Sequence, residues 1–388
     1  MDRDLAKAGD RVSRLPPRVA VLPDFWEEGW PSMDLCADQL LAHWPTTTAG
    51  AITASRVVPN FRRLASRVSQ RVGFNADRLL NRFVHYPRFV RRVANQYDAF
   101  HVVDHSYSQL VRSLPAKRTG VYCHDLDAFR CLLDPPADPR PRWFRAMARR
   151  ILTGLQHAAI VFHNSEQTGC QLQHFKLVDP ARLRHVPLGV APEFHPSSTP
   201  VTSPALQTLP TTPWIAHIGS CIPRKRIDVL LGVFAQLRMR QPDLKLVKVG
   251  GEWTAQQRDQ IAKLTLGTAI VHLKNLDRVE LATVYRRASV VLVPSDAEGF
   301  GLPVIEALAC GAIVVASDIP VLREAGGTAA MYAPVADVPA WVDVVRTLLA
   351  SPTLAPAREQ RLAWASQFSW VNHATTIAEA YRELLQCE

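Results

Sequence analysis

Short apolar runs alternate with longer amphipathic stretches along most of the chain. Runs rich in β-branched residues and bounded by polar or glycine-bearing loops are typical of strands buried on both faces of a parallel sheet. Between them, apolar residues recur at the spacing of helices that cover a sheet. The pattern therefore predicts an α/β fold. The predicted strands lie at residues 18–23, 98–105, 120–126, 158–165, 183–190, 214–219, 244–249, 269–273, 288–294 and 311–316.

The alternation is interrupted once, at residues 196–213, where Pro, Ser and Thr dominate and no charged residue occurs. Such a composition is typical of a linker. Strands alternate with helices on both sides, and 388 residues suit two domains. We therefore expect two Rossmann-like, doubly wound parallel-sheet domains facing each other across a cleft. The expected division is a first domain at 1–195, the linker, a second domain at 214–368 and a C-terminal helix at 369–388.

The stretch from Ser295 to Glu306 combines a glycine-rich loop with two carboxylates. It follows the predicted strand 288–294 and leads into a short helix, so backbone N–H groups and the positive end of a helix dipole lie at the carboxyl edge of the sheet. These groups suit phosphate. Glu298 and Glu306 would repel phosphate, so we expect them to accept hydrogen bonds from hydroxyls. Amides for phosphate and carboxylates for hydroxyls together suit a nucleotide sugar.

A second loop at the same predicted sheet edge carries three consecutive cations at residues 224–226. It follows the strand that ends at Gly219 and precedes a predicted helix at 227–238. Cations in a loop between a strand and a helix can neutralise a diphosphate. The alternative is an exposed basic turn.

Polar side chains also follow strands of the first half. His124 and Asp125 are polar residues at the end of the predicted strand 120–126. Binding sites of parallel sheets lie at such strand ends, although a lone histidine there can equally be structural. Gly29, in the loop after the first strand, is either a site glycine or a simple turn glycine. The dinucleotide fingerprint G-x-G-x-x-G is absent there, which argues against an NAD enzyme.

Residues 56–92 are the most basic part of the chain, with ten arginines against one acid, Asp77. The segment predicts a basic amphipathic helix that can lie on an anionic membrane surface. The alternative is a domain helix whose apolar stripe packs inward and whose arginines are solvated. Residues 140–150 add five arginines and no acid, a second basic surface. The apolar stripe of the predicted helix consists of Phe61, Leu64, Ala65, Val68 and Val72.

The net charge of +10 implies an anionic partner. No stacking-aromatic motif accompanies the arginines, which argues against nucleic acid. Seven scattered cysteines without a C-x-x-C pair favour reduced thiols. The N-terminal segment is charged and lacks an apolar signal region. We therefore expect a cytoplasmic protein, peripheral on the inner face of the membrane where the basic helix contacts it.

Several motifs, in matching order, resemble the retaining glycosyltransferases of family four, which have the GT-B fold. The resemblance covers most of the chain, and its most specific part is the pair of glutamates in Glu298-Gly-Phe-Gly-Leu-Pro-Val-Ile-Glu306. It implies that the first domain binds the acceptor, that the second binds the nucleotide sugar, and that the C-terminal helix packs back on the first domain. The other matching segments are residues 219–225 (diphosphate loop), 121–126 (histidine strand), 183–195 (interdomain segment) and 368–370 (start of the closing helix).

By this resemblance, Glu298 contacts hydroxyls of the donor sugar and Glu306 holds the ribose. His124 lies beside the donor sugar at the reacting centre, and Arg224 and Lys225 neutralise the leaving diphosphate. The resemblance thus implies a catalytic set of His124, Arg224, Lys225 and Glu298. The remaining residues implied in donor binding are Gly29, Gly219, Ser220, Leu276, Gly299, Phe300, Gly301 and Leu302.

The sequence departs from the family pattern at two places. Ser220 stands where many members carry an arginine, so the cationic role falls on Arg224 and Lys225. Residues 27–32 replace the family's N-terminal pair of glycines and leave Gly29 as the matching position.

The resemblance implies transfer, with retention, of a hexose from GDP-mannose or a UDP-sugar to a glycan or lipid-linked acceptor in surface polysaccharide biosynthesis. The resemblance also implies that no cofactor or divalent metal is needed. The sequence agrees, because no D-x-D motif marks a strand end: the D-x-D spacing of Asp125 and Asp127 lies in the histidine segment. One alternative is a non-catalytic, glycosyltransferase-like partner subunit that binds a nucleotide. Another is a nucleotide-sugar epimerase of GT-B fold.

Overall fold

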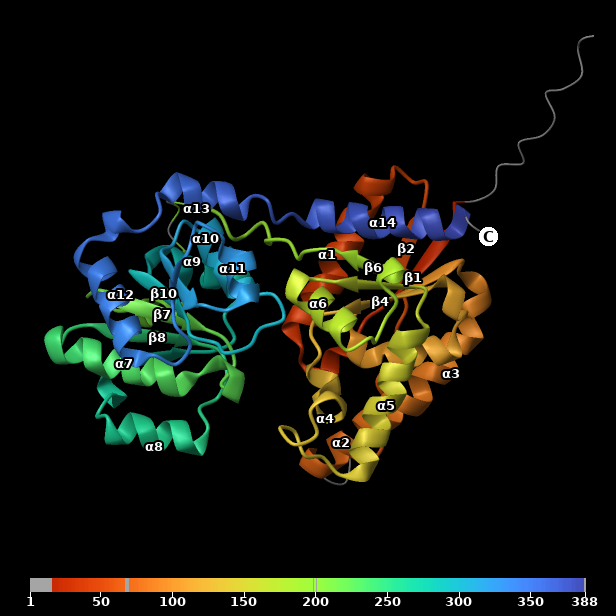
Figure 1. Cartoon of the computed structure of the whole chain (residues 1–388), viewed down its shortest axis with the longest axis horizontal. Helices are drawn as coiled ribbons and strands as arrows, with labels where there is room; N and C mark the ends of the chain where they lie inside the picture. Colours follow the sequence, from red (N-terminus) through yellow and green to blue (C-terminus); the bar gives the residue numbers. More distant parts are fainter. Residues whose placement is uncertain (1–15, 67–69, 198, 200, 387–388) are drawn as a thin grey trace, which may run out of the picture. The chain divides into compact units, whose positions relative to one another are not determined.

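The computed structural model describes residues 16–66, 70–197, 199 and 201–386. It contains two parallel sheets with helices packed against them, as Figure 1 shows. The predicted class, α/β with two doubly wound parallel sheets, is confirmed.

The first sheet has the strand order β2-β1-β3-β4-β5-β6. β2 was not predicted from the sequence, because its four residues TASR lack the apolar run of a buried strand. It pairs with β1, and β1 pairs with β3 on its other side. The strands are β1 Arg18–Leu22, β2 Thr53–Arg56, β3 Ala99–Val102, β4 Thr119–Cys123, β5 Ile160–His163 and β6 Leu183–His185.

The second sheet has the order β12-β11-β10-β7-β8-β9. The chain winds outward in both directions from the pair β7 and β10, which makes that pair the topological switch point, where doubly wound sheets bind their ligands. In the first sheet the switch point lies between β1 and β3. The strands are β7 Trp214–Ile218, β8 Lys245–Val249, β9 Ile270–Leu273, β10 Val290–Val293, β11 Val314–Ser317 and β12 Met331–Ala333.

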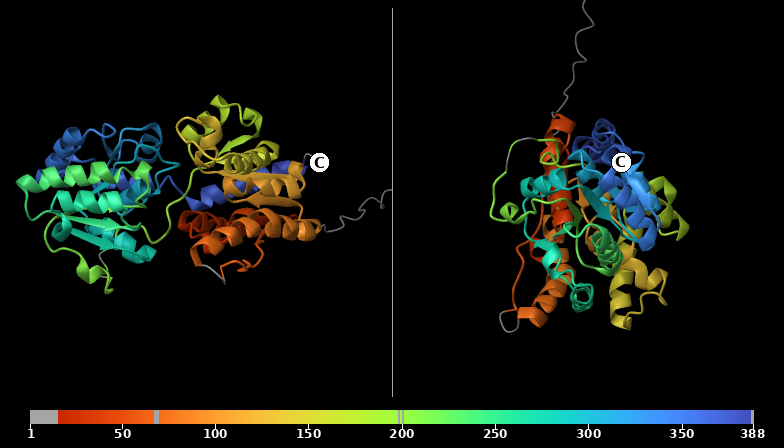
Figure 2. Two further views of the ribbon diagram at one scale, coloured as in Figure 1. Left: turned by 90° about the horizontal axis from the view of Figure 1, so that it is seen from below. Right: turned by 90° about the vertical axis from the view of Figure 1, so that its left-hand side faces the viewer.

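Helices follow most strands and pack against the sheets (Figure 2). They bury apolar faces, as α7 does with Leu230, Leu231 and Phe234. The helices of the first half are α1 Pro31–Thr48, α2 Gln70–Leu80, α3 Tyr86–Val93, α4 Arg130–Leu133, α5 Arg142–His157 and α6 Glu166–His174. Those of the second half are α7 Ile227–Arg240, α8 Ala255–Lys263, α9 Arg278–Arg287, α10 Leu302–Ala309, α11 Pro320–Gly326, α12 Val338–Ala350, α13 Arg358–Ala365 and α14 Trp370–Gln386.

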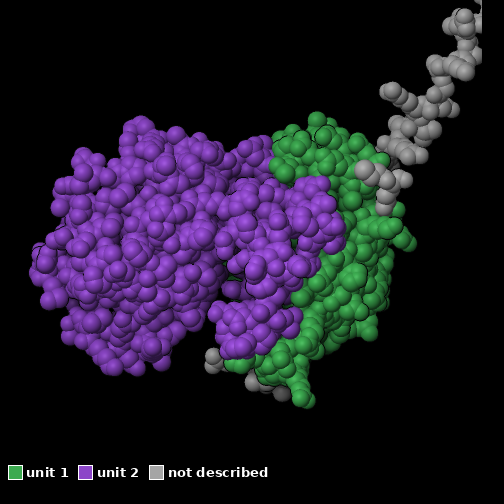
Figure 3. Space-filling view, in the orientation of Figure 1, with its two compact units in different colours: residues 1–122, 139–161, 374–388 green, residues 123–138, 162–373 purple. Residues whose placement is uncertain are grey.

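The chain forms two compact units, coloured in Figure 3. Unit 1 contains residues 1–122, 139–161 and 374–388, and unit 2 contains residues 123–138 and 162–373. The domain boundaries expected at 195 and 214 stay a prediction.

The expected linker contains a buried turn. Its short 3-10 helix η8 Leu206–Thr208 buries Leu206, and Leu209 directly after it is buried as well. Residues 198 and 200 of this stretch lie outside the described residues.

The last part of α14 belongs to unit 1 because Tyr381 joins it to β3. The Tyr381 hydroxyl donates a hydrogen bond to the Phe100 carbonyl at 2.8 Å and lies 3.1 Å from Nδ1 of His101. The same ring lies 6.4 Å, centroid to centroid, from Trp44 of α1. A strand of the sheet and a helix of the first half thus hold the end of the chain.

The prediction of an amphipathic helix in the segment 56–92 is wrong for residues 57–66, which are not helical. The backbone N–H groups of Leu64, Ala65 and Ser66 donate to the buried Asp77 carboxylate at 3.0, 2.8 and 2.9 Å. This segment therefore folds onto α2 as a turn and does not extend it. Of the residues predicted there, Arg67, Val68 and the side chains of Arg71 and Val72 lie outside the described residues.

We expect Asp77→Ala to destabilise unit 1, because the carboxylate accepts these three N–H groups and the Ser66 hydroxyl at 2.6 Å. The expected loss in free energy of unfolding is about 2–4 kcal/mol, measured by chemical denaturation. The matched control is Asp38→Ala, which removes one exposed ion pair with Arg56 and should cost about 0–1 kcal/mol. Equal losses in the two variants would contradict the role of Asp77.

Candidate functional site

The loops that follow β7 and β10 lie next to each other, since the two strands pair through Ile215 with Val290 and Ala216 with Val291. Gly219 follows β7, and Ser295 lies two residues beyond β10. The two loops that the sequence marked for a diphosphate and for hydroxyls therefore meet at the switch point of the second sheet, where a ligand site is expected.

Glu298 and the two predicted cations form a single ion cluster. Nζ of Lys225 lies 2.5 Å from Oε1 of Glu298, and a guanidinium nitrogen of Arg224 lies 3.2 Å from Oε2. The Ser295 hydroxyl donates to the same carboxylate at 2.6 Å. The Glu298 side chain is only 5% exposed, so these contacts are weakly screened. The structure thus brings together three of the four residues predicted as catalytic.

Gly219 and Lys225 pack against each other at the base of the cation loop. Gly219 has φ +153°, and a Cβ built there would lie 3.7 Å from Cε of Lys225. Arg226, at φ 46°, is a left-handed residue that turns the chain into α7. The backbone conformations of Gly219 and Arg226 therefore define the two ends of the loop that carries the cations.

Lys248 is a buried cation that the sequence reading missed. Its ammonium donates to the carbonyl of Gly219 at 2.8 Å, to that of Val249 at 3.1 Å and to that of Gly250. Burial lowers the pKa of Lys248 to about 8. The sequence signal was a lysine within the apolar strand KLVKV, a place where a charge needs buried partners.

His217 lies beneath the same loop and stays neutral. Burial, followed by the charge of Lys248, lowers its pKa to about 3. Its Nδ1 lies 3.0 Å from the Leu292 carbonyl, so this nitrogen carries the proton. The ammonium groups of Lys248 and Lys225 would repel a protonated imidazole, so the neutral form is favoured.

The glycine-rich loop leads into α10 through a turn that requires glycine. Gly301 caps the helix at φ 102°, and a Cβ there would lie 2.9 Å from Cδ2 of Leu322. Leu302 is the first helical residue. Phe300 is buried and meets the ring of Phe368 edge-on at 5.7 Å. The anchored phenyl ring holds the start of the helix in place, where free N–H groups can receive an anion.

Glu306 lies further along α10 and is buried. The Tyr285 hydroxyl donates to it at 2.9 Å. Burial raises the pKa of Glu306 to about 7, although the Tyr285 hydrogen bond and the charge of Arg278 act in the opposite direction. The structure thus shows this carboxylate accepting a hydroxyl, the kind of partner predicted for it.

His124 belongs to the same compact unit as the glycine-rich loop. A Cβ built on Gly299 would lie 2.5 Å from the His124 carbonyl oxygen, so only glycine permits this approach. Three residues further, Asp127 lies 3.6 Å from Nε of Arg224. The segment after β4 therefore touches both the loop and the ion cluster.

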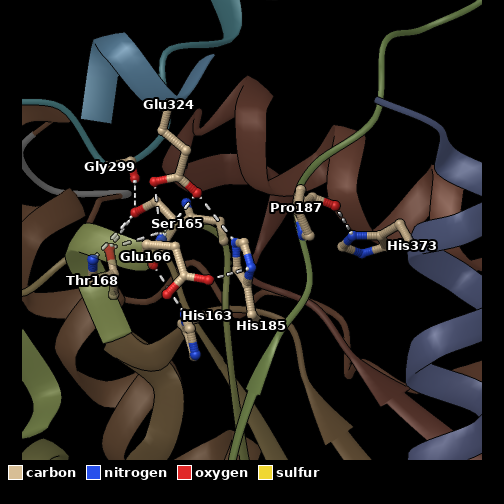
Figure 4. A network of polar contacts seen from close by, with 10 residues as sticks. His163, Ser165, Glu166, Thr168, His185, Pro187, Gly299, Glu324 and His373 are labelled. Atoms are coloured by element: carbon tan, nitrogen blue, oxygen red, sulfur yellow. Dashed lines mark hydrogen bonds and ion pairs between the residues drawn. The ribbon is translucent and has the colours of Figure 1, made fainter. Parts of the chain in front are cut away.

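A polar network holds the other side of the loop, as Figure 4 shows. The Ser165 hydroxyl donates to the Gly299 carbonyl at 2.9 Å. Ser165 is also the N-cap of α6 and accepts the N–H of Thr168. Both carboxylate oxygens of Glu324 accept the N–H of Glu166, at 3.0 and 2.9 Å. Gly299 is thus fixed from the segments after β4 and after β5.

His185 ties this network to α11. Its ring lies 3.0 Å from Glu166 and 3.3 Å from Glu324, and it stacks on His163 with centroids 5.2 Å apart. Burial lowers the pKa of His185, but the hydrogen bond to Glu324 and the charge of Glu166 outweigh it and leave that pKa above its ordinary value. These residues are far apart in the sequence, and nothing in their spacing showed that they meet.

The other predicted donor-binding positions occupy loops. Ser220 is exposed, and its Cα would lie 2.8 Å from a Cβ on Gly251. Leu276 is half-buried and directly precedes Asp277, the N-cap of α9. Gly29 lies in unit 1 at φ 68°, where a Cβ would meet no atom within 4 Å. Glycine is therefore favoured at position 29 by the positive φ angle and not by the close approach of another atom.

The switch point of the first sheet holds a buried acidic cluster that the sequence reading missed. Asp24 follows β1 and Asp104 follows β3, and both are buried. Neither carboxylate oxygen of Asp24 has a hydrogen-bond partner among the described residues. Burial, and then the charge of Asp104, raise the pKa of Asp24 well above its ordinary value.

Glu28, near this cluster, carries compensating partners. Nε of Arg78 lies 2.9 Å from its carboxylate, Arg82 lies at 3.7 Å, and the Tyr107 hydroxyl donates at 2.6 Å. The signal that could have found the cluster is an acid at or just past the end of two predicted strands, similar to the position that marked His124.

Within the described ranges, no group of three His, Cys, Asp or Glu side chains is placed to hold a metal ion. No helix in the described part of the chain is both long and apolar enough to cross a bilayer. Metal independence stays a prediction.

We expect the stability of the protein to fall as pH rises from about 4.5 to 7, in part through Glu306. The folded state binds this proton more tightly than the unfolded chain, so stability is lost as the carboxyl ionises. Glu306→Gln should remove this slope and gain on the order of 3 kcal/mol over wild type near pH 8, measured by denaturation at several pH values. Parallel curves for the two proteins would contradict the assigned pKa.

Residues 203–366 match the family model described as Glycosyl transferases group 1. The O-antigen chain mannosyltransferase B of Escherichia coli is 29% identical over 272 residues, which are 67% of this chain and 69% of that relative. A D-inositol 3-phosphate glycosyltransferase of Mycolicibacterium paratuberculosis is 31% identical over 235 residues, which are 58% of this chain and 52% of that relative. The match thus spans about half the length of relatives of the second kind.

Solved structures show the same fold. A sucrose-phosphate synthase of Thermosynechococcus elongatus superposes with a TM-score of 0.72 at 20% identity. The superposition covers 96% of this chain and 100% of the synthase chain. The HepE protein of Anabaena, in complex with UDP and glucose, superposes with a TM-score of 0.69 at 18% identity, over 94% of this chain and 99% of that one. The predicted resemblance is confirmed: residues 203–366 belong to the Glycosyl transferases group 1 family, and the chain has the GT-B fold of glycosyltransferases.

Proposed function

We propose that the protein is a retaining hexosyltransferase that moves a sugar from a nucleoside-diphosphate donor to a glycan or lipid-linked acceptor. The observation that carries the proposal is the ion cluster of Glu298, Lys225 and Arg224 beside the glycine-rich start of α10. It joins phosphate-binding and hydroxyl-binding groups at one switch point.

Departure of a nucleoside diphosphate leaves negative charge on its phosphates. Lys225, Arg224 and the N–H groups at the start of α10 would stabilise that charge in the transition state, where it is largest. Lys225 is already buried and held, so little reorganisation is needed at the moment of reaction. This is the condition under which electrostatic stabilisation is most effective.

Glu298 would change partners when the donor binds. Phosphate oxygens and the Glu298 carboxylate compete for the same two cations. Once phosphate takes the cations, the carboxylate is left to accept hydrogen bonds from sugar hydroxyls. The sugar hydroxyls of the donor would thereby replace the cations as hydrogen-bond partners of the buried Glu298. A diphosphate without a sugar has no such hydroxyls and would leave Glu298 without such partners.

Glu306 would hold the ribose hydroxyls in the place where it now accepts Tyr285. His124, whose carbonyl touches Gly299, would border the donor sugar. In this reading the acceptor attacks from the face that the diphosphate leaves, and a phosphate oxygen takes the acceptor proton. No protein nucleophile, metal ion or cofactor takes part.

The names of two relatives support a choice among donors and acceptors. The Escherichia coli relative is a mannosyltransferase of the O-antigen chain, which favours GDP-mannose and a role in surface polysaccharide synthesis on the cytoplasmic side. The HepE protein was solved with UDP and glucose, which keeps a UDP-sugar as the second choice.

A thermal-shift panel tests the proposed donor. GDP-mannose should raise the melting temperature more than UDP- or ADP-sugars, since a ligand that binds only the folded state stabilises it. The metal chelator EDTA should leave the shift unchanged. A panel in which no nucleotide sugar shifts the melting temperature would refute the proposal, and formation of an epimer without acceptor would favour the epimerase reading.

We expect Lys225→Ala to abolish sugar transfer while the fold survives. The change removes the buried cation nearest Glu298, and the loss of transition-state stabilisation should be at least about 100-fold in kcat/KM. Radiolabelled or chromatographic transfer assays measure it. The matched control is Lys245→Met on β8, whose ammonium bonds only the Thr268 carbonyl among the described residues. A Lys225→Ala enzyme with near-normal turnover would contradict the assigned role.

Lys248→Met should raise KM for the donor about tenfold and change kcat less. The ammonium of Lys248 draws the carbonyls of Gly219, Val249 and Gly250 inward and so fixes the loop that faces the diphosphate. Initial-rate kinetics separate the two parameters, with Lys245→Met again as control. A large fall in kcat at unchanged KM would instead place Lys248 in the chemical step.

A further inference from the structure

The basic surface of unit 1 draws on both basic segments of the sequence, residues 56–92 and 140–150, and on Arg112 from outside them. Among the described side chains of residues 56–92, three arginines pair with carboxylates: Arg78 and Arg82 with the buried Glu28, and Arg56 with Asp38. These side chains stabilise the fold of the unit. They leave less charge in that segment for an external anion than the count of ten arginines implies.

Four other arginines converge on an open cavity of about 460 Å³. Arg91 comes from α3, Arg112 from the 3-10 helix η4 (His105–Ser113), and Arg149 and Arg150 from α5. Both α3 and α5 contact η4, which explains why cations so distant in sequence meet. The rest of the lining is small or polar, with Ser113, Ala146 and Thr153.

No acid balances this cavity. The elements α3, η4 and α5 contain no Asp or Glu. All four arginines are exposed, and among the described residues none of them forms an ion pair with a carboxylate. Arg150 is the most constrained, because its guanidinium lies 5.7 Å from the ring centroid of Phe83. Four like charges around one cavity repel one another unless an anion neutralises them.

The open form of the cavity favours a phosphate at a surface over an enclosed soluble ligand. Soluble ligands are mostly buried by their pockets, whereas a lipid headgroup stays half-hydrated at the bilayer. The cavity face of α5 also carries Trp143, which is 63% exposed and lies one turn before Ala146 and two turns before Arg150. Tryptophan prefers the interface between headgroups and acyl chains.

We propose that this cavity binds the phosphate of an anionic phospholipid headgroup and thereby docks unit 1 on a membrane surface. Arg91, Arg112, Arg149 and Arg150 supply the charge, and their planar forks can each give a phosphate two hydrogen bonds. Trp143 enters the interface beside the headgroup. The inference goes beyond the proposed transfer reaction and does not rest on it, because its test measures binding alone.

The test is co-sedimentation of the full chain with two kinds of vesicle, phosphatidylcholine alone and phosphatidylcholine mixed with phosphatidylglycerol. Binding is expected only to the mixed vesicles. Arg112→Gln/Arg149→Gln should weaken it about 25-fold, since each arginine near an anionic surface contributes about fivefold. Absence of binding by the wild type to the mixed vesicles would overturn the proposal.

Two controls distinguish binding at the arginine cavity from non-specific attraction by the positive charge of the whole protein. Arg240→Gln/Arg287→Gln removes the same charge from exposed arginines of α7 and α9, and should weaken binding less than about threefold. Arg112→Lys/Arg149→Lys keeps the charge but loses the forks, and should weaken binding about tenfold. Equal weakening by the two glutamine pairs, or no effect of the lysine pair, would overturn the site. Circular dichroism confirms that each variant is folded.

A last arm identifies the source of the phosphate. Inorganic phosphate and glycerol 3-phosphate should leave the melting temperature of the wild type unchanged, because only a membrane adds the contact of Trp143. A thermal shift that the glutamine pair at Arg112 and Arg149 abolishes, without vesicle binding, would show a soluble phosphate ligand and overturn the lipid assignment.

Discussion

The arrangement of unit 2 depends on keeping one carboxylate, that of Glu298, buried between two cations. A buried charge is tolerated only with close partners, and Lys225, Arg224 and the Ser295 hydroxyl provide them. These partners come from the loops after β7 and β10, so the cluster also fixes how the two loops lie. Removing Glu298 would leave Lys225 and Arg224 without this partner, and removing both cations would leave the buried carboxylate uncompensated, which explains why the site needs both loops at once.

The glycine-rich loop is held on two sides, by a main-chain carbonyl and by a serine hydroxyl. Gly299 touches the His124 carbonyl on one side, and its own carbonyl accepts the Ser165 hydroxyl on the other. Glu324 in turn holds the start of α6, the helix that Ser165 caps. The loop is therefore part of a hydrogen-bonded framework, and its position is set before any donor arrives.

Sequence reasoning reached the parts of this site that are local in the chain. The strand, glycine loop and helix around Glu298 were predicted because periodicity and turn residues specify them within a dozen positions. The strand β2 escaped because tertiary pairing with β1, and not apolar character, makes it a strand. The helix predicted over 57–66 failed because Asp77, from the next helix, takes the N–H groups that a helix would have used. Lys248, Glu324 and His185 were missed because their partners are distant in sequence.

The buried acids at the carboxyl ends of β1 and β3 change how the first sheet would meet a ligand. With its pKa raised by burial and by Asp104, the Asp24 carboxyl retains its proton under conditions in which an exposed aspartate has lost it. A protonated carboxyl has an O–H to give as well as a carbonyl oxygen to receive. At this edge Asp24 can therefore donate a hydrogen bond, and the cluster carries less negative charge than its residue types imply.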